Sequence, residues 1–145
     1  MIIKSNSIFI AVFICFTLSL AAVANAEVQG KEISYKAGGA SLKGYIAYDN
    51  AIKGKRPGIL VVHEWWGHNQ HARDRANMLA GLGYTALALD MYGDGKVADH
   101  PQKAGEFLNE AFKDWEGSKA KFNEAKKILQ EHETVDPKKI GVIGF

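Results

Sequence analysis

Two short segments carry most of the side chains that could take part in chemistry. The first is His63-Glu64-Trp65-Trp66-Gly67-His68-Asn69, and the second is Asp90-Met91-Tyr92-Gly93-Asp94-Gly95. Each follows an apolar run, over 58–63 and 84–90, of the kind found in strands buried on both faces. In open parallel sheets, ligands bind outside the carboxyl ends of the strands. We therefore expect the functional site at these two loops.

The histidines of the first segment do not match a common metal site. A zinc protease helix needs a second histidine four residues after the first, and Gly67 occupies that place after His63. The only cysteine of the chain is Cys15, so the rest of the sequence offers no thiolate ligand. We expect no metal and no cofactor. A metal-binding protein using His63, Glu64 and His68 remains an alternative hypothesis.

Composition excludes several classes of protein. The 145 residues are 47% hydrophobic and 23% charged, which is typical of a globular domain and excludes disordered and coiled-coil chains. Lys and Arg number 18 and Asp and Glu 16, so there is no electrostatic case for nucleic acid as a partner. Gly67 alone does not make the three-glycine dinucleotide-binding fingerprint.

Residues 1–26 have the three parts of a secretory signal peptide. Lys4 supplies the positive start, residues 8–20 form an apolar run too short for a comfortable membrane span, and Ala24-Asn25-Ala26 is a small-x-small cleavage site. Ile14 precedes Cys15, which argues against a lipid anchor. We expect a periplasmic or secreted protein of residues 27–145, without stable membrane association after cleavage.

Residues 27–145 read as one α/β domain. Alternation and turn residues predict an antiparallel hairpin, and the remaining strands alternate with amphipathic helices, which calls for a mostly parallel sheet of about five strands. Asn69 is placed to begin the first helix and Gly83 to end it. The predicted strands are 32–35, 40–48, 58–63, 84–90 and 139–145, and the predicted helices begin near Asn69, Pro101 and Asp114.

Two details of this pattern can be checked directly. Apolar residues recur at helical spacing after Pro101, which predicts a buried helix face. The Asp136-Pro137 pair predicts a turn before the last strand. The members of the predicted buried face are Ala104, Phe107, Leu108, Ala111, Phe112 and Trp115.

The motifs taken together resemble the dienelactone hydrolase family. The resemblance rests on the strand and loop Ile59 to Gly67, on Arg73-Asp74-Arg75-Ala76, and on the run Gly83 to Gly93. It extends from about Glu32 to Phe145. It implies an α/β-hydrolase fold and hydrolysis of a small-molecule ester or lactone by nucleophilic acyl transfer.

The resemblance also implies roles for individual residues. Glu64 matches the family's motif glutamate, which lies beside the nucleophile, and Trp65 matches the residue whose main-chain N–H helps to form the oxyanion hole. Trp65, Trp66 and Tyr92 would flank the mouth of the substrate pocket, although packing against the sheet is an equal alternative for Trp66. Asp94 stands where some members carry a substrate-binding arginine, which favours a neutral ester or lactone over a carboxylate.

The sequence Ile140 to Phe145 is similar to the strand that leads into the family's nucleophile elbow. We therefore expect the amino-terminal part of a hydrolase, cut just before its nucleophile and inactive alone. The alternative is a small exported α/β protein that binds a ligand or a metal.

Overall fold

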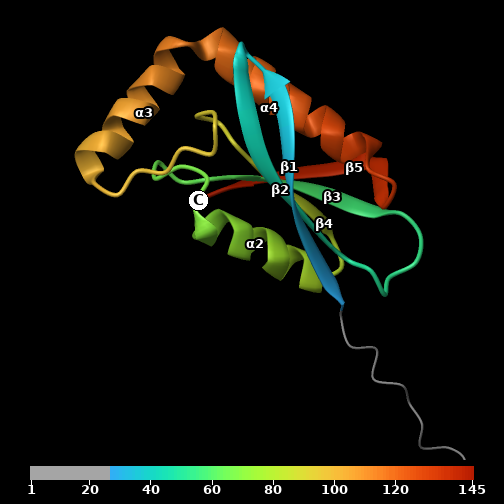
Figure 1. The fold of residues 1–145 in the computed structure, drawn as a ribbon. Helices are drawn as coiled ribbons and strands as arrows, with labels where there is room; N and C mark the ends of the chain where they lie inside the picture. Colours follow the sequence, from blue (N-terminus) through green and yellow to red (C-terminus); the bar gives the residue numbers. More distant parts are fainter. Residues whose placement is uncertain (1–26) are drawn as a thin grey trace, which may run out of the picture.

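The computed structural model describes residues 27–145, and Figure 1 shows their arrangement. The predicted signal peptide, 1–26, lies outside the described residues. The strands are β1 (Val28–Ala37), β2 (Ala40–Asp49), β3 (Arg56–Val62), β4 (Thr85–Leu89) and β5 (Val135–Gly144). The helices are α2 (Gln70–Gly81), α3 (Pro101–Lys113) and α4 (Trp115–Glu131). None of the helices in the described part of the chain is long and apolar enough to cross a bilayer.

The five strands form one mixed sheet in the order β1-β2-β4-β3-β5. β1 and β2 form the predicted antiparallel hairpin, and β2 pairs antiparallel with β4. β4, β3 and β5 run parallel. The predicted architecture is therefore confirmed, and the parallel part brings the carboxyl ends of β3 and β4 to the same edge.

Helices cover both faces of the sheet (Figure 1). α2 buries Ala72, Ala76 and Ala80 against small side chains of β2, β3 and β4. On the other face, α4 buries Ala125 and Leu129 against the larger apolar side chains of the same strands. β4 is buried along its whole length. Its sequence, TALAL, does not alternate between polar and apolar residues, as expected for a central strand that is buried on both faces.

The predicted ends of α2 are confirmed. The Asn69 side chain accepts a hydrogen bond from the N–H of Ala72 at 3.2 Å, which caps the first turn. Leu82 is the last cap residue, and Gly83 follows with φ +92°, a left-handed conformation that favours glycine. These caps fix where the chain leaves the site loop and where it enters β4.

Two strands begin four residues earlier than predicted, at 28 instead of 32 and at 135 instead of 139. β1 begins at Val28, because the whole of β2 is available as its partner from Asp49 back to Ala40. β5 begins at Val135, so the predicted turn at Asp136-Pro137 is wrong. The pairing of β5 with β3 shifts register between Val135 and Ile140, and the intervening residues bulge out of the ladder.

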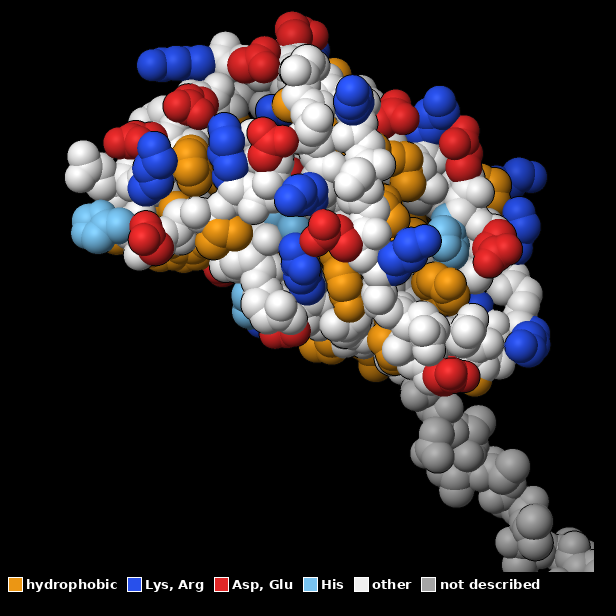
Figure 2. Space-filling view, in the orientation of Figure 1, with side chains coloured by type: hydrophobic (Ala, Val, Ile, Leu, Met, Phe, Trp, Pro, Cys, Tyr) orange, Lys and Arg blue, Asp and Glu red, His pale blue; other side chains and the backbone are white. Residues whose placement is uncertain are grey.

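The predicted buried face of the second helix is only partly correct. Ala104 and Phe107 are buried, but Phe112 and Trp115 are 64% and 57% exposed. The backbone leaves helical geometry at Asp114, where α3 ends and α4 begins. The helical period therefore does not continue to Trp115. Figure 2 shows that positively and negatively charged side chains are interspersed over the visible face of the molecule.

Candidate active site

The two chemistry-bearing loops contact each other directly. They follow β3 and β4, which are adjacent and parallel, with Val62 paired to Leu89 at their carboxyl ends. The main-chain N–H of Met91 donates to Nε2 of His63 at 3.2 Å. The phenol of Tyr92 donates to the carbonyl of Trp65 at 3.1 Å. The expected meeting of the two loops is therefore found.

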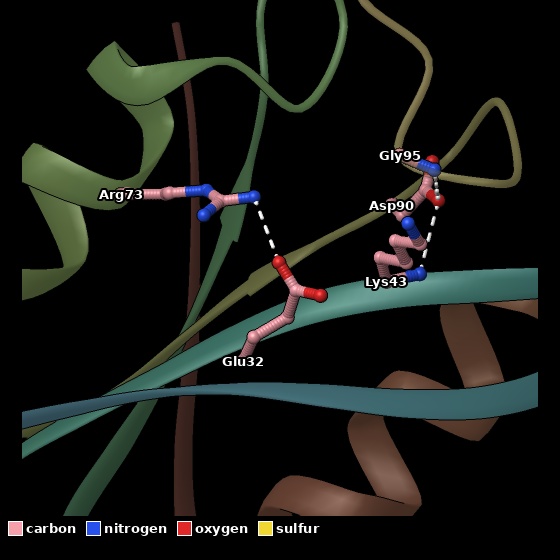
Figure 3. Close-up of polar contacts among 5 residues, drawn as sticks. All are labelled: Glu32, Lys43, Arg73, Asp90 and Gly95. Carbon is pink, nitrogen blue, oxygen red and sulfur yellow. Dashed lines mark hydrogen bonds and ion pairs between the residues drawn. The ribbon is translucent and has the colours of Figure 1, made fainter.

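Asp90 organises the second loop from inside the protein. Its side chain is fully buried, and its two carboxylate oxygens accept four main-chain hydrogen bonds. Figure 3 shows the bonds from Lys43 and Gly95, at 3.1 and 2.8 Å. The N–H groups of Tyr92 and Gly93 supply the other two, at 3.0 and 2.8 Å. A carboxylate held this way closes the loop into a tight turn and joins it to β2.

The first loop is a hydrogen-bonded turn with the two tryptophans at its corner. The N–H of Gly67 donates to the carbonyl of Glu64 at 3.1 Å, so Trp65 and Trp66 are its central residues. Gly67 has φ +95°, and a side chain there would collide with the carbonyl of Lys96. Among the described residues, no acceptor takes a hydrogen bond from the N–H of Trp65. That N–H is available to a ligand.

Glu64 stands at the start of this turn. Its side chain is half-buried, and within residues 27–145 its carboxylate makes neither a hydrogen bond nor an ion pair. Among the described residues, no N–H group of its own loop donates to the Glu64 carboxylate. A carboxylate in this position is free to act on a neighbouring group.

His63 is held by the main chain through both ring nitrogens. Nε2 accepts from the N–H of Met91, and Nδ1 lies 2.7 Å from the carbonyl oxygen of Glu64. Burial lowers the pKa of His63 below its usual value, with hydrogen bonding to Glu64 and the charge of Asp90 acting in the opposite direction. His63 is therefore a neutral, oriented ring.

His68 is buried with 1% of its surface exposed, and neither ring nitrogen has a partner among the described residues. Burial, and secondarily the charge of Arg73, lower the pKa of His68 to about 4. Since both nitrogens of His63 are engaged, the proposed metal site of His63, Glu64 and His68 is not supported. In the described part of the chain, no three ligating side chains form a group that could hold a metal ion.

An apolar cavity of about 210 Å³ opens between the two loops and the helices α3 and α4. Trp65 and Tyr92 line it, together with the exposed aromatic residues Phe112 and Trp115. The other lining residues are Val62, His63, Met91, Leu108, Ala111 and Ser118. The surface that a ligand would meet here is therefore mostly aromatic and aliphatic.

Two residues singled out in the sequence do not line this cavity. Trp66 packs with Tyr92 against the small cluster of Ala98, Ala104 and Phe107, which belongs to α3 and the segment before it and not to the sheet. Asp94 lies at the far side of its loop, where its N–H donates to the carbonyl of Ser41 at 2.8 Å. The charge of Asp94 therefore carries no argument about the substrate.

Comparisons with known proteins identify the family to which this chain belongs. The sequence model of the dienelactone hydrolase family matches residues 42–145, which include both loops. The chain belongs to the dienelactone hydrolase family. "Protein usf" of Aquifex pyrophilus is 33% identical over 120 residues, which are 80% of this chain and 50% of that protein.

Solved structures of the family share the fold. The structure "m3DLH" superposes with a TM-score of 0.77 at 36% identity, covering 82% of this chain and 50% of that one. The dienelactone hydrolase-like promiscuous phosphotriesterase P91, from metagenomic libraries, has a TM-score of 0.77 at 32% identity, covering 83% and 50%. This dienelactone hydrolase family chain thus has the α/β-hydrolase fold and spans about half the length of these relatives.

The described residues of this family member hold no hydroxyl–histidine pair at the loops. Thr134 Oγ1 lies 2.9 Å from Nδ1 of His132, but this contact is beside Val135, which pairs with Arg56 at the opposite end of β3. The hydroxyl of Ser118 donates to the carbonyl of Ala111. Within residues 27–145, the two loops therefore carry the turn at Trp65 and the cavity, but no hydroxyl–histidine pair.

Sequence reasoning missed the residues that hold the site together. Asp90 stood out as a candidate in the sequence, but its role in holding the loop was not predicted. The signal for that role is a carboxylate directly after an apolar strand, followed by Gly93 and Gly95, which favours a turn around the carboxylate. The main-chain contacts of His63 and the burial of His68 depend on how the loops pack and have no local sequence signal.

Proposed function

We propose that this chain supplies the oxyanion-binding loop and the substrate cavity of an enzyme that hydrolyses neutral esters or lactones by nucleophilic acyl transfer. The observation that carries the proposal is that Trp65, whose N–H has no acceptor among the described residues, lines an apolar cavity. The family membership of the chain supports hydrolysis as the class of reaction.

The role of Trp65 follows from the charge that forms during acyl transfer. Attack of a nucleophile on the ester carbonyl converts that oxygen into an oxyanion, and the Trp65 N–H donates to it. Removing one such preorganised donor costs about 3 kcal/mol of transition-state stabilisation in known hydrolases. The hydrogen-bonded turn that presents this N–H is fixed before substrate arrives, so little reorganisation is needed.

Glu64 acts on the nucleophile in this proposal. Its carboxylate is adjacent in sequence to the oxyanion donor and free of partners among the described residues. It can hold or accept the proton of a nucleophilic thiol or hydroxyl that approaches the same carbonyl.

The cavity indicates the substrate class. Cavities of roughly 150 Å³ hold a benzene ring, so about 210 Å³ suits one aromatic or short aliphatic group. Aromatic walls at Trp65, Tyr92 and Trp115 match an apolar group and offer no cation for a carboxylate. We place the apolar part of a neutral ester or lactone there, against Trp65, Tyr92 and Trp115.

The 145 residues do not turn over esters by themselves in this proposal, because a nucleophile and base are needed together with the oxyanion donor. The whole enzyme would act outside the cytoplasm, a proposal supported by the signal-like pattern of residues 1–26.

Ligand binding and turnover of the purified protein test this proposal separately. Acetophenone, a neutral ester mimic that cannot be hydrolysed, should quench or shift tryptophan fluorescence saturably. Ala111→Phe, which fills the cavity, should abolish this effect, and Ala120→Phe, at an exposed position of α4, should not. Release of 4-nitrophenol from its acetate should not exceed that of unfolded protein. No saturable binding, or equal effects of both variants, would contradict the substrate site.

A further inference from the structure

We propose that His63 is a positioning residue whose ring holds the peptide plane between Glu64 and Trp65 and so aims the Trp65 N–H. The use of that N–H in catalysis rests on the proposed function. The clamp itself is a property of the fold and is measurable without turnover.

The two contacts of the ring determine where its proton resides. A main-chain N–H can only donate, so Nε2, at 3.2 Å from the N of Met91, must accept and carry no proton. In the neutral ring the proton is then on Nδ1, which lies 2.7 Å from the carbonyl oxygen of Glu64 and donates to it. The surroundings thus select one tautomer of His63.

This donation fixes the direction of the Trp65 N–H. The carbonyl of Glu64 and the N–H of Trp65 belong to the same planar trans peptide and point in opposite directions. The same carbonyl also accepts from the N–H of Gly67 at 3.1 Å. Turning the N–H of Trp65 away from its present direction would therefore break two hydrogen bonds at once.

The peptide on the other side of Trp65 is held as well. Its carbonyl accepts from the phenol of Tyr92, and the rings of Tyr92 and His63 contact edge to face, with centroids 4.8 Å apart. Each of the two peptides flanking Trp65 is therefore held by a side chain, His63 on one side and Tyr92 on the other.

Met91, whose N–H donates to the His63 ring, is itself hydrogen-bonded to helix α4. Nζ of the buried Lys121, on α4, donates to the carbonyl of Met91 at 3.2 Å. A chain of hydrogen bonds consequently runs from α4 through the loop after β4 to the turn after β3. His63 is the central link, because among the described residues no other side chain joins Met91 to Glu64.

Nuclear magnetic resonance of the uniformly ¹⁵N-labelled protein tests the clamp directly. Long-range ¹H–¹⁵N correlation at neutral pH should show His63 with a protonated Nδ1 and an unprotonated Nε2. A proton on Nε2, or a charged ring at neutral pH, would overturn the proposal. This measurement needs no variant, so it decides the matter even where a substitution prevents folding.

Two substitutions separate clamping from mere filling of space. His63→Asn keeps a donor at the position of Nδ1, whereas His63→Phe keeps the ring shape and removes both contacts. In His63→Phe the Gly67 amide should exchange at least about tenfold faster, because its acceptor carbonyl is released, and the Trp65 amide resonance should move. His63→Asn should leave both near the wild-type values. His132→Phe, a half-buried histidine near Val135, is the matched control.

The results also distinguish this inference from the proposed function. Unchanged Gly67 exchange in His63→Phe, or the same change in His132→Phe, would overturn the clamp whatever the enzyme does. If the tautomer and exchange results are as expected and a complete enzyme carrying this chain hydrolyses no ester, the proposed function fails and the clamp stands. In an active enzyme, His63→Phe should lower kcat at little-changed KM, and His63→Asn should restore it.

Discussion

The phenol of Tyr92 donates a hydrogen bond to the carbonyl of Trp65 across 3.1 Å, so a residue of the loop after β4 holds the loop after β3. Tyr92 also forms part of the cavity wall and packs against Phe107, with ring centroids 5.5 Å apart. One side chain therefore braces the turn after β3, shapes the cavity and links both to α3.

Tyr92→Phe tests this brace. This substitution keeps the aromatic ring that lines the cavity and removes the hydroxyl that donates to the Trp65 carbonyl. We expect the free energy of unfolding to fall by about 1 kcal/mol, the usual net value of one hydrogen bond. Urea unfolding measures it. Tyr48→Phe is the control, because the ring of Tyr48 packs against His132, remote from the loops. Equal losses in both variants would contradict the brace.

Asp90→Asn should damage the protein far more than any change at the surface. The carboxylate accepts four main-chain hydrogen bonds, and an amide would direct its own N–H groups at two of those donors. Because hydrogen bonds to a buried charge are the strong ones, we expect a loss of about 3 kcal/mol or more in urea unfolding. Asp136→Asn is the control and should lose well under half as much, because this carboxylate accepts one exposed N–H and forms an ion pair with the exposed Lys139 at 3.5 Å.

His68→Leu should stabilise the protein. The ring is buried with both nitrogens unpaired among the described residues, and leucine of similar size removes that desolvation penalty. The gain expected at neutral pH is about 1–2 kcal/mol. His71→Leu, at an exposed position of α2, is the matched control for changing a histidine to leucine. A destabilised His68→Leu protein would show that the ring has a partner that the structure does not display.

His68 should also make stability depend on pH. Burial lowers its pKa to about 4 in the folded protein, against about 6.5 in the unfolded chain. Between these values the unfolded state binds more protons, so stability is fully present above pH 6.5 and falls as the pH decreases toward 4. The two-and-a-half-unit difference corresponds to about 3 kcal/mol. His68→Leu should flatten this part of the profile in urea unfolding from pH 7 to 4.5, and an unchanged slope would contradict the assignment.

The β5 edge should make the chain self-associate. Among the described strands β5 pairs only with β3, and it exposes Val142 and Ile143 along with the following Phe145. An apolar edge with open N–H and carbonyl groups favours pairing between molecules. Val142→Lys should lower the apparent mass in concentration-dependent light scattering. Leu82→Lys, equally apolar and more exposed but remote from the edge, should not. A monodisperse wild-type monomer would contradict this prediction.

Sequence patterns predicted the elements well where one physical signal dominated. The buried runs gave β3 and β4, and Asn69 and Gly83 marked the ends of α2 correctly because capping is local. The predictions failed where pairing or a break in the backbone decided the outcome. The bulge after Val135 depends on its register with β3, and the exposure of Trp115 follows from the interruption at Asp114.

The site could be located from sequence but not assembled from it. The two loops were identifiable because they follow adjacent buried strands, and the predicted roles of Glu64 and Trp65 came from resemblance to a family. Their roles remain predictions, which the unpaired carboxylate and the unpaired N–H support. The contacts of His63, by contrast, join residues 28 positions apart, and no local pattern specifies them.

The most direct test of the central claim is ester turnover by a chimera. Residues 27–145 would be joined to the half of phosphotriesterase P91 that this chain does not match, since the matched part covers 50% of that protein. Hydrolysis of 4-nitrophenyl acetate would be compared with that of residues 27–145 alone and of the chimera carrying Glu64→Gln. The account predicts turnover by the chimera, strong loss with Glu64→Gln, and none by 27–145 alone. Turnover by 27–145 alone, or a folded chimera without activity, would contradict it.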